Sequence, residues 1–131
     1  MRIDTYITYA KLYSEDIKQD LILNSNSLNE LDVYCYNEDD ALVDITGATV
    51  YFIVKEKPTD TDVSAKILKT ITSLTSPEAG NFLIEITKTE CASLIGNYVY
   101  ELRISLAESG HEYILKEGNI TFKKSIYGIT S

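Results

Sequence analysis

The chain has 131 residues, of which 44% are hydrophobic and 24% charged, so it is long enough for one domain with its own core and is not disordered throughout. A formal net charge of -8 disfavours nucleic acid and anionic lipid as partners, because both are themselves negative. The sequence contains no run of about 18 consecutive apolar residues, so no membrane-spanning helix is predicted. No secretory leader is visible near Met1, and we expect synthesis in a cytoplasm.

Residues 1–16 alternate in part, with Ile3, Thr5 and Ile7 on one face of an extended strand. Two interpretations are equally open. The segment is either an extra edge strand of its own domain or an arm that pairs with a neighbouring subunit by strand addition. In the second interpretation the contact residues are the apolar and aromatic side chains near both termini: Ile3, Tyr6, Ile7, Tyr9, Tyr13, Ile126 and Tyr127.

Four segments predict β-strands, because apolar and polar residues alternate in them with a period of two. They are residues 31–36, 47–57, 80–87 and 96–106. The weaker strand candidates are residues 17–23, 67–74 and 111–122.

The last weak candidate, residues 111–122, changes parity along its length. Tyr113 lies on the odd positions and Phe122 on the even ones, with Gly118 between them. A β-bulge or a tight turn at Gly118 would restore the inward register, and we expect one there.

One short helical turn is predicted between two of the strands. Thr87 and Glu90 have the spacing of a capping box, and Gly96 ends the turn. Residues 37–40 carry turn chemistry that suits a hairpin between strands.

About seven strands, with a turn roughly every 8–12 residues, are typical of an immunoglobulin-like antiparallel β-sandwich. We expect an all-β fold of this kind, with one short helical turn and extended terminal arms. The domain spans residues 17–124, between an N-terminal arm of residues 1–16 and a C-terminal tail of residues 125–131. A jelly roll or another small β-barrel is the alternative, because strand count does not determine topology.

Residues that carry chemistry are few. His111 is the one histidine, so a zinc site with two or three histidines cannot form within one chain. A Ser-His-Asp triad would need His111, but the sequence has no Gly-x-Ser-x-Gly motif for its nucleophile. The acidic residues 38–44 lack the spacing of a calcium loop and suit a solvated hairpin tip. Cys35 and Cys91 are expected to be free thiols. We predict no catalytic residue, no metal ligand and no cofactor, and therefore no enzyme.

The most specific stretch is residues 42–56, where a turn at residues 44–47 precedes an apolar strand. Residues 71–77, 80–85 and 96–103 follow it in order. This succession resembles the immunoglobulin-like N-terminal domain of phage baseplate upper proteins and related phage tail, fibre and head-decoration domains. The resemblance covers about residues 17–124.

The resemblance implies a structural component of a tailed-phage virion, as a baseplate, tail, head-fibre or decoration subunit. Such a subunit is assembled in the host cytoplasm and binds other virion proteins and copies of itself, without nucleic acid or membrane insertion. The alternative is a module that binds carbohydrate or protein on the host surface. The family has no catalytic residues to transfer to this chain.

Overall fold

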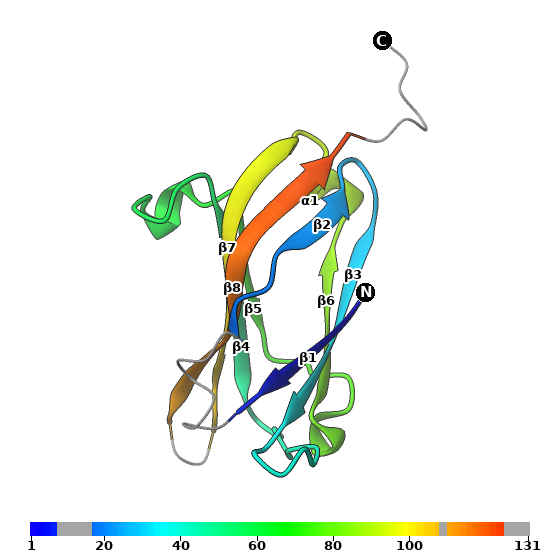
Figure 1. Cartoon of the computed structure of the whole chain (residues 1–131), viewed down its shortest axis with the longest axis vertical. Coiled ribbons are helices and arrows are strands. Elements are labelled where there is room, and N and C mark those ends of the chain that lie inside the picture. The colour runs from blue at the N-terminus through cyan, green and yellow to red at the C-terminus, as the bar shows by residue number, and fades with distance from the viewer. Residues whose placement is uncertain (8–16, 108–109, 125–131) are drawn as a thin grey trace.

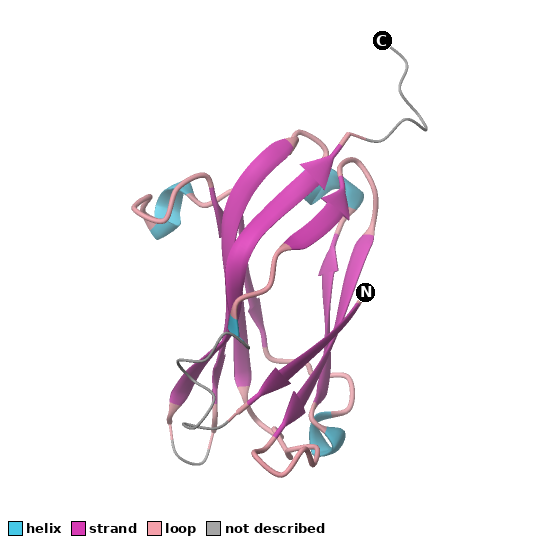
Figure 2. Cartoon of the chain, in the orientation of Figure 1, coloured by secondary structure: helices cyan, strands magenta, loops and turns pink. Residues whose placement is uncertain are grey.

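Two sheets of a β-sandwich are formed by the eight strands of the computed structural model, which describes residues 1–7, 17–107 and 110–124 (Figure 1, Figure 2). The strands are β1 (Arg2–Tyr6), β2 (Leu21–Asn24), β3 (Asn29–Tyr36), β4 (Thr49–Lys55), β5 (Ile67–Ile71), β6 (Asn81–Ile86), β7 (Gly96–Ser105) and β8 (Glu112–Lys123). The short helical elements are η2 (Asp62–Ser64), η3 (Pro77–Ala79) and α1 (Lys88–Cys91). No helix in the described part of the chain is long and apolar enough to cross a membrane.

The strand order confirms the all-β sandwich. One sheet has the order β1-β3-β6 and the other the order β2-β8-β7-β4-β5. In an immunoglobulin-type sandwich, strands B and E share one sheet and strands C, F and G the other. Here β3 and β6 occupy the first pair of places, and β4, β7 and β8 occupy the other three.

Two strand pairs are parallel, which the expectation of a wholly antiparallel sandwich missed. Strand β1 runs parallel to β3, with Ile3 opposite Val33, and β2 runs parallel to β8, with Leu23 opposite Phe122. Each is an N-terminal segment added at the edge of a sheet. The sandwich therefore includes β1, which is the edge-strand interpretation of the two left open for residues 1–16, although the domain bounds had placed this strand in an arm.

The core lies between the sheets and is built by the predicted alternation. In β3, Leu31, Val33 and Cys35 are fully buried, whereas the residues between them reach the outer surface. Removing such side chains from water stabilises a fold by roughly 1.5–3 kcal/mol each. The large side chains that fill the centre are Phe52, Phe82, Phe122, Ile84, Leu102, Ile104 and Leu115.

Strand β8 contains the expected bulge, but at Leu115 instead of Gly118. Along β7, Leu102 pairs with Lys116 and Arg103 pairs with Ile114, so Leu115 is the extra residue. Both Leu115 and Lys116 are consequently buried, and the inward face changes from odd to even positions at this point.

Gly118 has a different role, which depends on the close approach of another segment. Its φ is +155°, and a Cβ atom added there would lie 2.7 Å from the main-chain oxygen of Gln19. The amide of Gln19 donates to the carbonyl of Glu117 at 3.0 Å, and the Asp20 carboxylate accepts from the amide of Asn119 at 3.1 Å. These bonds hold the chain before β2 against β8.

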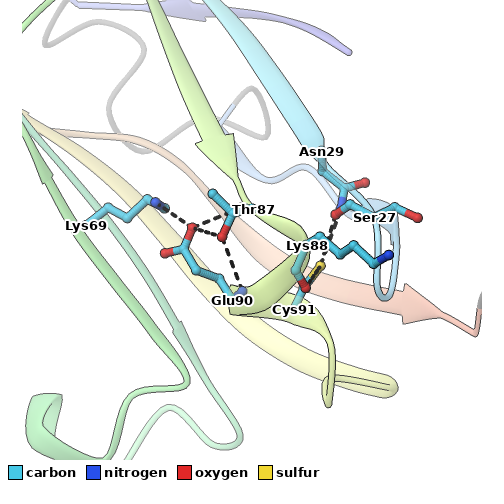
Figure 3. A network of polar contacts seen from close by, with 7 residues as sticks. All are labelled: Ser27, Asn29, Lys69, Thr87, Lys88, Glu90 and Cys91. Carbon is cyan, nitrogen blue, oxygen red and sulfur yellow. Dashed lines mark hydrogen bonds and ion pairs between the residues drawn. The ribbon is translucent and has the colours of Figure 1, made fainter.

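The predicted capping box is present at α1 (Figure 3). The amide of Glu90 donates to Thr87 Oγ1 at 3.2 Å, and the amide of Thr87 donates to Glu90 Oε1 at 2.9 Å. Lys69 of β5 reaches the same carboxylate at 2.8 Å, and so the pair links the five-stranded sheet to α1. On the other side of α1, the buried thiol of Cys91 donates to the carbonyl oxygen of Ser27 at 3.2 Å.

Candidate interaction surfaces

Three half-buried tyrosines lie on the outer face of the three-stranded sheet. Tyr34 and Tyr36 alternate with the buried residues of β3, and their side chains therefore point away from the core. The parallel register places Asp4 opposite Tyr34 and Tyr6 opposite Tyr36. Together with Arg2 of β1, these residues form what we call the tyrosine face.

Arg2 holds the tyrosine face together. Its guanidinium carbon lies 4.2 Å from the centre of the Tyr34 ring, within the range of a cation–π contact. Its Nη2 donates to the hydroxyl of Tyr36 at 2.7 Å, and its Nε donates to Asp4 Oδ1 at 3.0 Å. The hydrogen bonds to Asp4 and Tyr36 raise the pKa of Arg2. Arg2 thus orients the side chains of both Tyr34 and Tyr36.

Tyr6 connects this face to the hairpin that follows β3. Its ring centre lies 6.0 Å from that of Tyr36, and its hydroxyl donates to Asp40 Oδ1 at 2.7 Å. In that hairpin the Asn37 side chain accepts from the amides of Asp39 and Ala41, as the turn chemistry predicts. The carboxylate of Asp40 is therefore used in the fold of this surface.

Acidic residues dominate the outer side of the three-stranded sheet. Arg2 is the one cationic side chain among the described residues of β1, β3, β6 and the 37–40 hairpin. The carboxylates on the same side are Asp4, Asp32, Glu30, Glu38, Asp39, Asp40 and Glu85. Much of the negative charge of the chain is therefore gathered on one layer.

A second surface is the concave outer face of the five-stranded sheet, with a volume of about 760 Å³. Its floor is apolar and comes from Tyr51, Ile53, Leu68 and Val99. Charges of both signs surround it, and carboxylates outnumber cations by five to three among the described residues that line it. The closest ion pairs are Lys55 with Asp62 at 2.8 Å and Arg103 with Glu101 at 3.2 Å. The groove therefore combines an apolar floor with a negative rim, which disfavours an anionic ligand.

Tyr100 lies at the inner wall of this groove but is committed to the fold. Its hydroxyl donates to the main-chain oxygen of Gln19, which fastens β7 to the chain before β2. Burial, together with the nearby carboxylates of Asp20 and Glu117, raises the pKa of Tyr100. The phenol therefore stays protonated at neutral pH and serves as a hydrogen-bond donor.

The structure corrects two of the contact residues proposed from the sequence. Ile3 is 1% exposed and Ile7 9% exposed, and both belong to the core of their own chain. The reason is that β1 pairs with β3 of the same chain and turns these side chains inward. Tyr6 is half-buried on the outer face, and its role as a contact residue stays a prediction. The other candidates lie outside the described residues: Tyr9, Tyr13, Ile126 and Tyr127.

Sequence reasoning missed the remaining residues of the tyrosine face. The alternation within residues 31–36 placed Tyr34 and Tyr36 on the outer side of a strand. Nothing in the sequence linked them to Arg2, because that contact depends on the parallel pairing of β1 with β3.

Two groups that could perform chemistry, Asp44 and Cys35, are engaged in the fold. Within the described ranges, no three His, Cys, Asp or Glu side chains gather as metal ligands. Asp44 accepts from the amide and hydroxyl of Thr46, and these bonds lower the pKa of its carboxyl group. Burial raises the pKa of the Cys35 thiol to about 12. A thiol of this kind is not a nucleophile at neutral pH.

Comparison with known proteins shows the fold. No model of a known protein family matches the sequence, and no curated protein matches it. Among solved structures, the chain is similar to the N-terminal domain of phage TP901-1 ORF48, with a TM-score of 0.52. The similarity covers 94% of this chain and 98% of that chain, at 8% sequence identity. The likeness is therefore one of architecture over nearly the whole of both chains.

Proposed function

We propose that this chain is a structural component of a tailed-phage particle and that it acts by protein–protein assembly. The observation that carries the proposal is the similarity in fold, nearly end to end, to a domain of a phage protein. The order of sequence motifs between residues 42 and 103, which resembles that of phage baseplate and tail domains, supports the same role independently. A baseplate or tail position follows most directly from that resemblance, ahead of a head-fibre or decoration position.

The chemistry of the tyrosine face suits an assembly role. Tyrosine and arginine are the side chains most enriched where protein interfaces are energetically strong. Here Arg2 fixes Tyr34 and Tyr36 in advance, and a partner would lose little side-chain entropy on binding them. The acidic surroundings add specificity for a basic partner surface. Other virion proteins, and copies of this chain at other surfaces, are the partners that we propose.

A host-surface binding module is the second candidate, since exposed aromatic rings also stack on sugars. The structure offers less support for it. Arg2 already covers one face of the Tyr34 ring, and the hydroxyls of Tyr6 and Tyr36 are engaged with Asp40 and Asp4. A glycan array probed with the purified chain separates the candidates: micromolar binding to a defined sugar would favour the second one.

Immunogold electron microscopy of particles from the phage that encodes the chain tests the first proposal. An antibody against the chain is expected to label the end of the tail that carries the baseplate. A particle whose copy of the gene has been deleted serves as the control and should show no label. Label on the head would support a decoration role instead, and unlabelled particles with the chain free in the lysate would contradict the proposal.

A further inference from the structure

Strand β6 is the outermost strand of the three-stranded sheet, and no described strand pairs with its free side. In an immunoglobulin-type sandwich, strand D lies at this place, beside strand E. This chain instead passes from β5 to β6 through residues 72–80, which form η3 and a single bridge between Ser76 and Asn81. The fold therefore leaves room for one further strand beside β6.

The register shows which main-chain groups face that open side. In an antiparallel pair, successive residues turn their N–H and C=O groups alternately toward and away from the partner strand. Asn81 exchanges two main-chain hydrogen bonds of 3.1 Å with Ser76, on the side away from β3. Leu83 and Glu85 have the same parity as Asn81, and their N–H and C=O groups therefore face the open side as well.

A groove of about 310 Å³ lies along this edge. Leu83 and Glu85 form one wall, and the opposite wall comes from Lys69, Ile71, Ser73 and Thr75, in and just after β5. The bond pair between Ser76 and Asn81 ends the groove at one side. The ammonium of Lys69 is already paired with the Glu90 carboxylate of α1 at 2.8 Å (Figure 3). The half-buried Ile71 offers an apolar contact to a side chain that points inward.

Glu85 is an exposed carboxylate of this edge, and the one cation among the described residues that line the groove, Lys69, is paired with Glu90 instead. Glu85 lies directly opposite Glu30 of β3, in a pair whose side chains approach closely. Like charges in this arrangement are destabilising. Neither carboxylate has an ion pair within the described part of the chain. An added strand with a lysine or arginine beside Glu85 would give this carboxylate an ion pair and reduce the repulsion between Glu85 and Glu30.

The edge has few of the features that keep exposed strands apart. Natural proteins protect such edges with charged side chains, above all lysine, with proline, bulges or very short strands, or with a covering helix or loop. Strand β6 carries one charged side chain, Glu85, and no lysine, proline or bulge, whereas the edge strand β5 carries Lys69 and the edge strand β2 has only four residues. Beyond the bridge between Ser76 and Asn81, the edge is therefore a template for pairing with another chain.

From these observations we infer that the β6 edge binds an extended segment of a different protein, which adds to the sheet as a strand antiparallel or parallel to β6. The segment has alternate apolar residues that face Ile71 and a basic residue beside Glu85. Up to four main-chain hydrogen bonds to Leu83 and Glu85 give affinity, and the alternate side chains give specificity. The identity of the partner as a particle protein rests on the proposed function, whereas the edge geometry does not.

The substitution Glu85→Lys tests the inference in the full chain. A lysine there would face Glu30, and the variant is expected to be at least as stable as the parent to urea. Supplied in trans to particles that lack the gene, it should be incorporated at least about tenfold less than the parent, because it repels the partner's cation. The control Glu56→Lys makes the same charge change just after β4, in the other sheet, where Glu56 is exposed, and should be incorporated within about twofold of the parent.

Hydrogen exchange supplies a second readout that does not depend on a variant. In the free chain, the amides of Leu83 and Glu85 should exchange quickly and that of Ile84 slowly. In particles, the amides of Leu83 and Glu85 should slow by at least about tenfold, because each becomes a strand hydrogen bond.

The outcomes separate the two proposals. Normal incorporation of Glu85→Lys, with unchanged exchange at Leu83 and Glu85, would overturn the strand inference and leave the particle role intact. Failure of the unmodified chain to enter particles would contradict the proposed function instead. A concentration-dependent dimer of the purified chain that Glu85→Lys abolishes would show that a second copy occupies the edge, which would overturn our assignment of a different partner.

Discussion

The hydroxyl of Thr5 donates a hydrogen bond of 2.8 Å to the main-chain oxygen of Leu115, across 110 residues of sequence and from one sheet to the other. Leu115 is the extra residue of the bulge in β8, and a bulged residue is left out of the normal ladder. Thr5 therefore satisfies a buried carbonyl that would otherwise lack a partner, and it fastens β1 to the five-stranded sheet.

The substitution Thr5→Val should destabilise the chain by about 1–3 kcal/mol, because it keeps the shape and leaves the Leu115 carbonyl buried without a donor. The free energy of unfolding in urea measures the change. Thr70→Val on the exposed side of β5 is the control and should change stability by less than about 0.5 kcal/mol. Equal effects of the two substitutions would show that the Thr5 bond contributes nothing.

Gly118→Ala should cost roughly 1–3 kcal/mol, because the new Cβ would meet the main-chain oxygen of Gln19 at 2.7 Å. Gly110→Ala separates this collision from the cost of positive φ alone: Gly110 has a φ of +68° and no atom within 4 Å of the added Cβ. We expect a loss of about 1 kcal/mol there. Thermal unfolding of both variants is the measurement, and a smaller loss for Gly118→Ala than for Gly110→Ala would contradict the packing described.

The sequence predicts the parts of this fold that depend on neighbouring residues, and it misses the parts that depend on contacts between distant segments. The central strands and the Thr87–Glu90 capping box were predicted correctly, because alternation and capping are local patterns. The bulge at Leu115 was placed at Gly118 instead. Gly118 is required by the approach of Gln19, a contact between distant segments that periodicity does not encode.

The interaction surfaces were harder to predict for the same reason. Ile3 and Ile7 show the alternation of a strand, but that pattern fits a strand of the same sheet as well as one added to a neighbour. The contact of Arg2 with Tyr34 follows only from the parallel register of β1. The open edge of β6 depends on which strand is missing beside it, and only the topology shows this.

Acid should weaken the link between β5 and α1. Burial alone would raise the pKa of Glu90, but the Lys69 ammonium and the bonds to Thr87 outweigh it and lower the pKa below the usual 4.5. The folded state therefore favours the carboxylate. This contribution to stability is present above about pH 4.5 and is lost as the pH falls through the lower folded-state value.

The substitution Glu90→Gln should remove that part of the pH dependence. Urea unfolding between about pH 3 and pH 6 compares the variant with the parent, and the parent's advantage should shrink toward the acid end. Glu38→Gln in the exposed hairpin should leave the shape of the curve unchanged. A curve for Glu90→Gln that runs parallel to that of the parent would contradict the assignment.

Both cysteine thiols should be protected in the folded chain. Cys35 and Cys91 are fully buried, and the pKa of Cys35 is raised to about 12. We expect reaction with a thiol reagent at pH 8 to be at least about a hundredfold slower than in the variant Ser64→Cys, whose new thiol would be exposed. In urea both native thiols should react fully. Fast reaction of either one in the folded state would show that its part of the core opens readily.

Quantitative mass spectrometry of particles purified on a density gradient tests the assembly role most directly. We expect the chain to band with the particles, in a fixed ratio to the major tail proteins that survives washing with high salt. A chain that is abundant in the lysate but absent from the banded particles would show that it is not a component of the virion.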